Sequence, residues 1–182
     1  MGLGTRLTPS LIDFIQRQKL FFVATAAATG RVNLSPKGAD ALRVKGPNVI
    51  RWLNLSGSGN ETAGHLRETN RMTLMFCAFD GDALILRTYG TATMLHPRDA
   101  GWADAAAEFP EMAGSRQIFD MTITSVQTSC GTGVPLMDFK ADRIEQELLP
   151  FYEDMGEEGV KAYWRRKNVE TLDGFPTGLF ED

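Results

Sequence analysis

Cysteine and histidine are scarce in this chain of 182 residues, which contains two of each. Cys77 and Cys130 are too few for a disulfide framework, and no pair of Cys or His residues has the spacing of a zinc site. A low content of unpaired cysteine is typical of proteins from a reducing compartment. We therefore expect neither a metal centre nor a disulfide-stabilised secreted fold.

Long apolar segments and an excess of basic charge are also missing. The longest apolar runs, near Leu20–Ala28 and Met72–Phe79, are under half of the roughly 20 residues that span a bilayer. The N-terminus lacks the apolar core of a signal peptide. Nineteen basic and 23 acidic residues give a net charge of −4, which argues against nucleic acid as the main partner. We expect a soluble, cytoplasmic protein that binds neither membrane nor nucleic acid.

Short apolar segments separated by turn residues dominate the pattern. The 18 glycines and 8 prolines are spread along the chain, as in a turn-rich β protein. We predict strands at 20–27, 31–35, 42–45, 49–55, 72–79, 83–95 and 117–129, and helices at about 9–19, 60–68 and 96–109. The pattern predicts a mainly β fold, an antiparallel barrel of six to seven strands with helical decoration, rather than an alternating parallel sheet.

The C-terminal part of the chain differs in charge from the rest. Residues 138–182 contain 12 acidic and 6 basic residues, and their apolar positions predict one or two helices docked on the body. We expect a single domain over residues 1–182, with a barrel core at about 11–135 and an acidic helical C-terminal extension at about 138–182.

The segment Gly57–Thr62 joins a predicted strand to a predicted helix. Its glycines allow a tight turn, and a helix that begins here would direct free N–H groups at an anion such as phosphate. Ser58 and Glu61 have the spacing of a capping box, in which Glu61 turns back to the Ser58 N–H. The alternative is a capped helix with a flexible entry loop and no ligand. The segment is neither a P-loop nor a dinucleotide fingerprint.

Basic residues are concentrated just before this loop. Positions 31–60 carry one acidic residue, Asp40, against five basic residues: Arg31, Lys37, Arg43, Lys45 and Arg51. Because they lie on adjacent predicted strands, several are expected to converge beside the loop and bind a phosphate dianion. The alternative is a solvated basic face.

Other polar or aromatic positions have both a functional and a structural interpretation. Trp52 and Asn54 share one face of their strand, where the Trp ring contacts either an aromatic ligand or the core. The break at Ser35–Gly38 exposes backbone N–H groups. Cys130, in a polar turn after a strand, is either reactive or simply a small buried residue. We expect no catalytic role for either histidine.

In order and spacing these segments resemble the pyridoxamine 5'-phosphate oxidase-like family of FMN-binding split β-barrels. The resemblance covers about residues 11–135. It rests on Phe21–Thr25, Val32–Gly38, Val49–Leu55, Ser58–Thr62 and Asn70–Phe76 taken together. The tail, with Ser129-Cys130-Gly131 and Leu172–Gly178, resembles an uncharacterised branch of this family.

The resemblance implies a homodimer with two FMN sites at the subunit interface. Carried over by position, Arg51, Trp52 and Asn54 lie on the strand that lines the flavin, and Asn60, Glu61 and Thr62 hold its phosphate. Ser35 and Lys37 approach the isoalloxazine or the ribityl chain. Ser129, Cys130 and Gly131 reach the ring from the other subunit. A surplus of apolar strand residues also favours a dimer: Met72, Leu74, Phe76, Leu84, Leu86 and Met94.

Two departures from the family pattern argue against pyridoxamine phosphate as the substrate. Trp164-Arg165-Arg166 falls in a predicted helix instead of a C-terminal strand, and Asn60-Glu61-Thr62 replaces Ser-Arg-Lys in the phosphate loop. The first hypothesis is an FMN-dependent oxidoreductase in which the flavin performs hydride or electron transfer on an unknown small substrate. The alternative is a carrier or redox sensor that binds flavin, haem or a deazaflavin without turnover, since no acid–base pair is recognisable.

Overall fold

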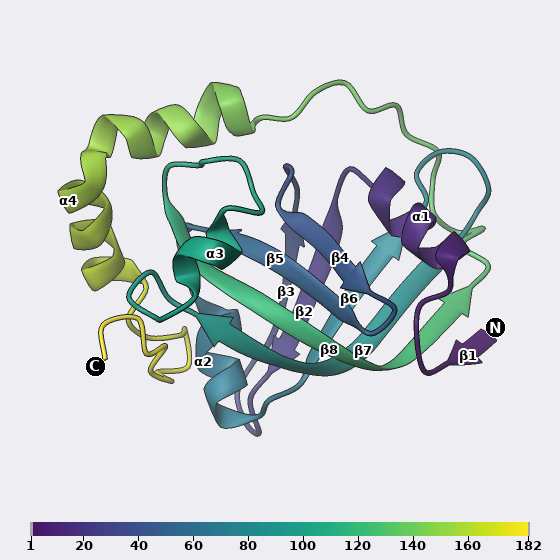
Figure 1. Ribbon diagram of the computed structural model, residues 1–182, viewed down its shortest axis with the longest axis horizontal. Coiled ribbons are helices and arrows are strands. Elements are labelled where there is room, and N and C mark those ends of the chain that lie inside the picture. Colours follow the sequence, from purple (N-terminus) through teal and green to yellow (C-terminus); the bar gives the residue numbers. More distant parts are fainter. Residues whose placement is uncertain (1, 182) are drawn as a thin grey trace.

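A long antiparallel sheet organises the computed structural model, which describes residues 2–181 (Figure 1). The strands are β1 (Gly2–Gly4), β2 (Phe21–Ala26), β3 (Val32–Lys37), β4 (Leu42–Gly46), β5 (Val49–Leu55), β6 (Met72–Cys77), β7 (Ile85–Leu95) and β8 (Ser115–Ser129). Their order is β3-β2-β6-β7-β8-β5-β4, and β1 also pairs with β8. The mainly β, antiparallel split barrel that the sequence predicted is confirmed, with the three-residue β1 as an unforeseen eighth strand.

Strand β8 connects the two parts of the sheet. One edge of β8 pairs with β7 from Ile118 to Ser129, while its other edge pairs first with β5 and then with β1. The long β7–β8 pair bends at a bulge between Tyr89 and Gly90. A side chain at Gly90 would collide with the Thr122 carbonyl, so only glycine permits this approach. The bend allows one strand to serve both parts of the sheet.

The barrel core is apolar and partly aromatic. The Trp52 and Phe119 rings are stacked with centroids 4.6 Å apart, and both residues are fully buried. Met72, Leu74, Phe76 and Leu86 are also buried in this core. Leu84 and Met94 are half-buried and pack against it. All six residues therefore pack within one chain and do not provide the surplus strand surface from which a dimer was predicted.

Within the described residues, three α-helices lie against the sheet and a fourth belongs to the C-terminal extension. They are α1 (Pro9–Arg17), α2 (Glu61–Glu68), α3 (Trp102–Ala106) and α4 (Leu149–Lys167), the last preceded by the π-helical turn η1 (Ile144–Leu148). The prediction that His96-Pro97 opens a helix was wrong. The Asp99 N–H donates to the His96 carbonyl in a turn instead, and α3 begins only after Gly101, whose φ is 90°.

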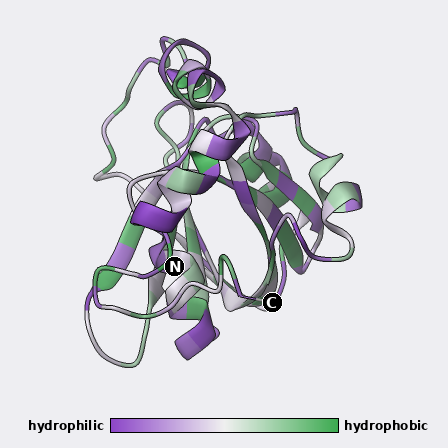
Figure 2. Cartoon of the chain, turned by 90° about the vertical axis from the view of Figure 1, so that its left-hand side faces the viewer, coloured by the Kyte–Doolittle hydropathy of each residue, from purple (hydrophilic) through white to green (hydrophobic). Residues whose placement is uncertain are grey.

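The acidic extension crosses the molecule and returns to its body. Residues after β8 run along one side to α4, which bends at Gly156, where φ is 65°. Figure 2 views the molecule from the side of α4, whose residues alternate between hydrophilic and hydrophobic. Its buried residues are Tyr152, Val160 and Trp164. The chain then turns beside α2, which brings residues 168–178 to the Gly57–Thr62 loop. Within residues 2–181, no helix combines the length and apolarity that a membrane crossing requires.

Candidate functional site

A polar cavity of about 650 Å³ lies where β3, the Gly57–Thr62 loop and the start of β8 meet. The first turn of α2 also lines it, together with Asn54, Arg116 and Leu172. As at any helix start, the first backbone N–H groups of α2 have no intrahelical acceptor. These groups give this end of the cavity a positive potential.

Arg116 is buried in the wall of this cavity, with 2% of its surface exposed. Its Nε donates to Gln117 Oε1 at 2.9 Å and its Nη1 to the Gly59 carbonyl at 3.1 Å. Burial lowers the pKa of the guanidinium to about 10, so it remains charged at neutral pH. Its hydrogen bonds within the described chain are to neutral oxygens.

Lys37 is the second cation of the cavity. Its Nζ donates to Asn54 Oδ1 at 3.2 Å and lies 5.4 Å from the centroid of the Trp52 ring. Burial, and then the neighbouring charge of Arg116, lower the pKa of the ammonium to about 8. Among residues 2–181, neither Lys37 nor Arg116 has a carboxylate within ion-pair distance. Two like charges share this site without a counterion, which is costly in a protein interior.

Several buried polar atoms in and around this cavity also lack a hydrogen-bond partner among residues 2–181. They are Asn60 Oδ1, His65 Nε2 and Gln117 Nε2. His65 is anchored by its other ring nitrogen, which lies 3.1 Å from Thr25 Oγ1. Buried polar atoms in native proteins are normally hydrogen-bonded. Together with the two cations they fit an anionic ligand that carries further hydrogen-bonding groups.

The C-terminal extension fixes the loop in place. The Asn168 side chain donates to the Gly57 carbonyl at 3.0 Å, and the backbone carbonyl of Asn168 accepts from Asn60 Nδ2 at 3.2 Å. Trp164 Nε1 donates to Ser56 Oγ at 2.6 Å. The Leu172 N–H donates to the carboxylate of Glu61 at 3.1 Å. The predicted capping box is therefore wrong: Asn60 occupies the N-cap position without a side-chain cap hydrogen bond, and Glu61 faces the tail instead of Ser58.

Gly64 and Arg31 provide two further attachments for the tail. A side chain at Gly64 would collide with Thr171 and Phe175, so glycine lets the tail pack directly on α2. Arg31 forms an ion pair with Asp173, whose carboxylate also accepts from the Arg31 backbone N–H at 2.6 Å. Because Asp173 neutralises Arg31, the unpaired positive charge of the cavity comes from Lys37 and Arg116.

Six of the predicted site residues line this cavity. They are Ser35, Lys37, Asn54, Asn60, Glu61 and Thr62. Ser35 Oγ donates to Asn33 Oδ1 at 2.9 Å, and Asn33 Nδ2 reaches Thr62 Oγ1 at 3.4 Å. The strand does not break at Ser35 as expected, because β3 is the end strand of the sheet and tolerates Pro36 as far as Lys37.

Arg51 and Trp52 do not line the cavity. Arg51 points to the opposite face of β5, where Asp120 accepts from its Nε at 2.7 Å and Glu108 from its Nη1 at 2.7 Å. The hydrogen bond to Asp120 raises the pKa of Arg51. Trp52 lies in the core, where only its contact with the Lys37 ammonium connects it to the site.

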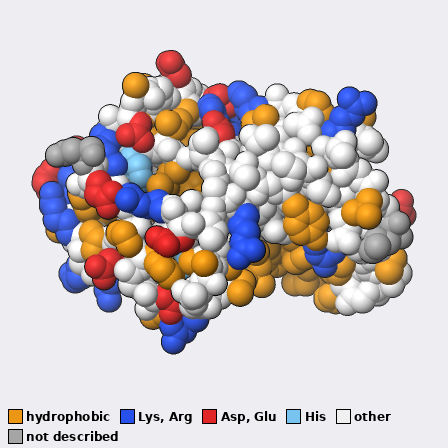
Figure 3. Space-filling view, turned by 90° about the horizontal axis from the view of Figure 1, so that it is seen from below, with side chains coloured by type: hydrophobic (Ala, Val, Ile, Leu, Met, Phe, Trp, Pro, Cys, Tyr) orange, Lys and Arg blue, Asp and Glu red, His pale blue; other side chains and the backbone are white. Residues whose placement is uncertain are grey.

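The prediction that several of the five basic residues converge beside the loop holds for two of them. Arg31 and Lys37 reach the cavity, whereas Arg43 pairs with Asp40 and Lys45 with Glu108. Viewed from below, acidic and basic side chains are mixed at the end of the molecule that carries the C-terminal tail (Figure 3). This face does not present a continuous basic surface.

Ser129, Cys130 and Gly131 lie at the far end of β8. Thirteen residues of strand, roughly 40 Å if extended, separate Arg116 from Ser129, so these three residues do not line the cavity of the same chain. The Cys130 thiol is exposed, and its hydrogen bond with Thr132 lowers its pKa. Burial raises the pKa of Cys77. The described residues contain no group of three or more His, Cys, Asp or Glu suited to a metal ion.

Sequence reasoning missed Arg116 and underestimated His65. Strand β8 was expected to begin at Gln117, which left Arg116 outside the element that directs it into the cavity. His65 follows Thr62 by three residues on α2, a spacing that places both on one face of the helix. This spacing is the feature of the sequence that could have placed His65 beside the predicted site residue Thr62.

Comparison with known proteins identifies the family. The family model described as pyridoxamine 5'-phosphate oxidase matches residues 7–130, more than half of the chain. The pyridoxamine 5'-phosphate oxidase family protein ustO of Aspergillus flavus is 35% identical over 187 residues, covering 93% of this chain and 75% of that protein. The chain belongs to the pyridoxamine 5'-phosphate oxidase family.

Solved structures show the same fold at low sequence identity. HupZ of Group A Streptococcus has a TM-score of 0.55 and 18% identity, and the match covers 72% of this chain and 99% of HupZ. A protein of Lactobacillus delbrueckii described as a pyridoxamine 5'-phosphate oxidase has a TM-score of 0.52 and 21% identity, over 67% and 93% of the two chains. These similarities concern the fold.

Proposed function

We propose that the protein binds FMN in the polar cavity and acts as a flavin-dependent oxidoreductase on a small substrate. The observation that carries the proposal is the pair of cations formed by the half-buried Lys37 and the buried Arg116, without an acidic partner in the described chain. A phosphate dianion would supply the missing charge, and charge-assisted hydrogen bonds to such a group are strong. Family membership supports flavin as the source of the phosphate.

The residues around the cavity suit the separate parts of FMN. The N–H groups at the start of α2, Thr62 Oγ1 and Arg116 would hold the phosphate. Asn33, Ser35 and the unpaired outer edge of β3 offer hydrogen-bonding groups to the ribityl chain and the ring. Lys37 would place a positive charge near the flavin. When bound, FMN supplies the hydride or electron transfer itself, so no side chain has to act as the redox group.

A second copy of the chain would complete the site. Large apolar side chains are exposed on β3, where Val32 is 75% and Leu34 61% exposed, and on the segment after β8, where Leu136 is 80% exposed. These exposed side chains support a homodimer that covers them. In such a dimer we expect Ser129, Cys130 and Gly131 to approach the flavin from the partner subunit. Light scattering at low micromolar concentration should give twice the 20.1 kDa of one chain, and a monomer would contradict this assembly.

The direct experiment is to identify the bound chromophore and then follow its reduction. Purified protein should show a flavin spectrum and release FMN on denaturation, whereas a Soret band would show the haem alternative. Colourless protein that does not bind added FMN contradicts the proposal. Stopped-flow reduction by NADH and NADPH, followed by reoxidation, separates an enzyme from a carrier or sensor. A bound flavin that none of these donors reduces would favour the non-catalytic alternative.

A further inference from the structure

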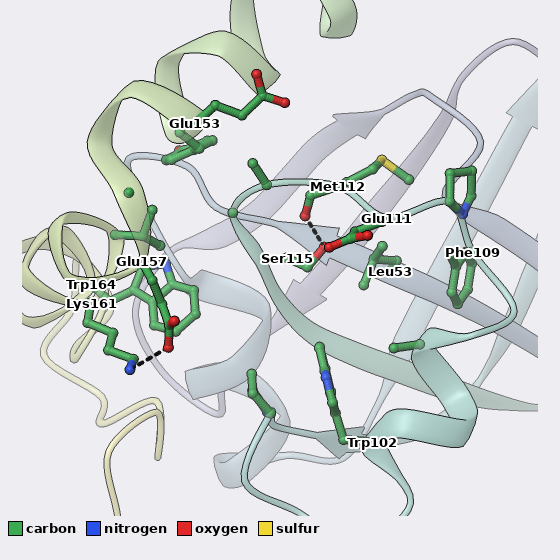
Figure 4. A pocket seen from close by; sticks show the side chains of 18 of the residues that line it. Leu53, Trp102, Phe109, Glu111, Met112, Ser115, Glu153, Glu157, Lys161 and Trp164 are labelled. Carbon is green, nitrogen blue, oxygen red and sulfur yellow. Dashed lines mark hydrogen bonds and ion pairs between the residues drawn. The ribbon is translucent and has the colours of Figure 1, made fainter.

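A second cavity, of about 750 Å³, lies between the barrel and α4 (Figure 4). It shares none of its lining residues with the polar cavity. Its volume falls within the range of small-molecule sites, about 300–1,000 Å³. Adjacent residues of β8 line the two cavities, since Ser115 lines this second cavity and its neighbour Arg116 lines the polar one.

Two separate apolar clusters face each other across this apolar cavity. Leu53, Phe109 and Met112 belong to the cluster around α3, while Val160 and Trp164 belong to the cluster on α4. In Figure 4 Phe109 and Trp102 lie on the side of the barrel and Trp164 on the side of α4. Apolar surfaces that leave a space between them forgo dispersion contacts that a ligand of suitable shape would restore.

The aromatic walls are held in fixed positions. Trp164 is 9% exposed, and the hydrogen bond from its Nε1 to Ser56 Oγ fixes the orientation of the indole. Phe109 is 7% exposed, and the Arg43 guanidinium lies 4.8 Å from the centroid of its ring. Fixed aromatic faces favour a flat aromatic ligand, because the order that stacking requires already exists in the free protein.

The rim of the apolar cavity is acidic. Glu111, Glu153 and Glu157 line it, and the lining contains one cation, Lys161. The Lys161 ammonium is engaged by Glu157 at 2.7 Å and Glu158 at 3.2 Å. Glu111 and Glu153 are exposed and form no ion pair within residues 2–181. The rim thus attracts a cation and repels a carboxylate.

We propose that the apolar cavity is a binding site for a small aromatic amine, with the ring against the aromatic walls Phe109 and Trp164 and the ammonium group at the glutamate rim. This site is separate from the proposed flavin site, and the proposal does not require that flavin binds. Aromatic stacking and the attraction of the ammonium group to the rim act together. An aromatic acid of the same shape gains only the first of these interactions.

Calorimetric titration with tryptamine and with indole-3-propionate tests this inference, because the two probes share the indole ring and differ in charge. Tryptamine should bind with a submillimolar Kd and indole-3-propionate more weakly. The double variant Glu111→Gln/Glu153→Gln should weaken tryptamine binding about three- to tenfold, the range for two exposed charges. It should leave the melting temperature nearly unchanged. Ala106→Trp should abolish binding by filling the cavity.

The negative outcomes are equally specific. Absence of tryptamine binding at millimolar concentration, equal binding of the two probes, or binding that survives Ala106→Trp would each overturn the proposal. If a second copy of the chain fills the cavity instead, tryptamine will not bind, and Ala106→Trp will change the mass measured by light scattering. Flavin content, measured on the same samples, reports separately on the polar cavity.

Discussion

Lys37 and Arg116 are connected through two neutral amides and not through a carboxylate. Lys37 donates to Asn54, Asn54 Nδ2 donates to Gln117 Oε1 at 3.0 Å, and Arg116 donates to the same oxygen at 2.9 Å. The amides hold the two cations in place but supply no negative charge. The free protein therefore carries an electrostatic cost that an anion would remove.

Replacing Arg116 by an apolar side chain of similar length should separate stability from binding. Arg116→Met removes a buried charge that lacks a counterion, so the melting temperature of the ligand-free protein should rise or stay unchanged. FMN affinity should fall at least tenfold, since a hydrogen bond to a charged group contributes about 1.5–3 kcal/mol. Thermal unfolding and fluorescence titration measure the two effects. A strongly destabilised variant would mean that Arg116 serves the fold and not a ligand.

FMN binding should weaken as the pH rises above about 8. In the free protein the pKa of Lys37 is lowered to about 8, whereas a bound phosphate favours the charged form. Above pH 8 binding must therefore be accompanied by proton uptake at Lys37, which reduces affinity by at most about tenfold per pH unit. FMN titrations at several pH values between 7 and 9 measure how steeply the affinity falls. The Lys37→Met variant serves as the control, because its profile should be flatter, and identical slopes would show that another group titrates.

Arg51 should matter for stability and not for the ligand. Its guanidinium is partly buried and pairs with Asp120 and Glu108 on the face of β5 opposite the cavity. Arg51→Ala should lower the free energy of unfolding by about 2 kcal/mol, because it leaves the Asp120 carboxylate without its partner, whereas Glu108 keeps Lys45. Urea denaturation measures this loss. FMN affinity should remain within twofold of that of the unsubstituted protein. A large loss of affinity would show that Arg51 contributes to FMN binding.

Asn168 should couple the C-terminal extension to the Gly57–Thr62 loop. Its side chain is fully buried and donates to the Gly57 carbonyl, so Asn168→Ala removes the bond and leaves a small void. The free energy of unfolding should fall by about 1–3 kcal/mol, and FMN affinity should fall as the loop loses its fixed conformation. The exposed neighbouring residue Lys167 provides the control variant Lys167→Ala. Equal affinities in the two variants would show that the loop holds its shape without the tail.

Local periodicity predicted most of the fold. Short runs rich in β-branched, aromatic and other apolar residues, such as 20–27 and 49–55, predicted strands within two residues of β2 and β5, because such side chains are the ones a sheet buries. The short β1 has no such pattern, and its pairing with β8 joins residues more than 120 positions apart. The turn at His96–Asp99 depends on a hydrogen bond from the His96 N–H to the Asp99 side chain, which competes with the helix that Pro97 suggested.

The candidate site was less predictable, because it depends on which face a strand presents. Period two places Arg51 and Asn54 on opposite faces of β5, so only one of them can line a given cavity. The Asn54 face carries the site. The contacts of Asn168 with Gly57 and Asn60 join residues more than 100 positions apart, and spacing in the sequence does not reveal them.

A comparison of FMN with riboflavin tests the central claim most directly, since the two ligands differ only in the phosphate. Titration of the flavin-free protein should show FMN binding at least roughly 100-fold more tightly, the effect of two charge-assisted hydrogen bonds. In the Arg116→Met variant this preference should shrink by at least tenfold. Equal affinity for both flavins, or a preference that Arg116→Met leaves unchanged, would contradict a phosphate held between Lys37, Arg116 and the start of α2.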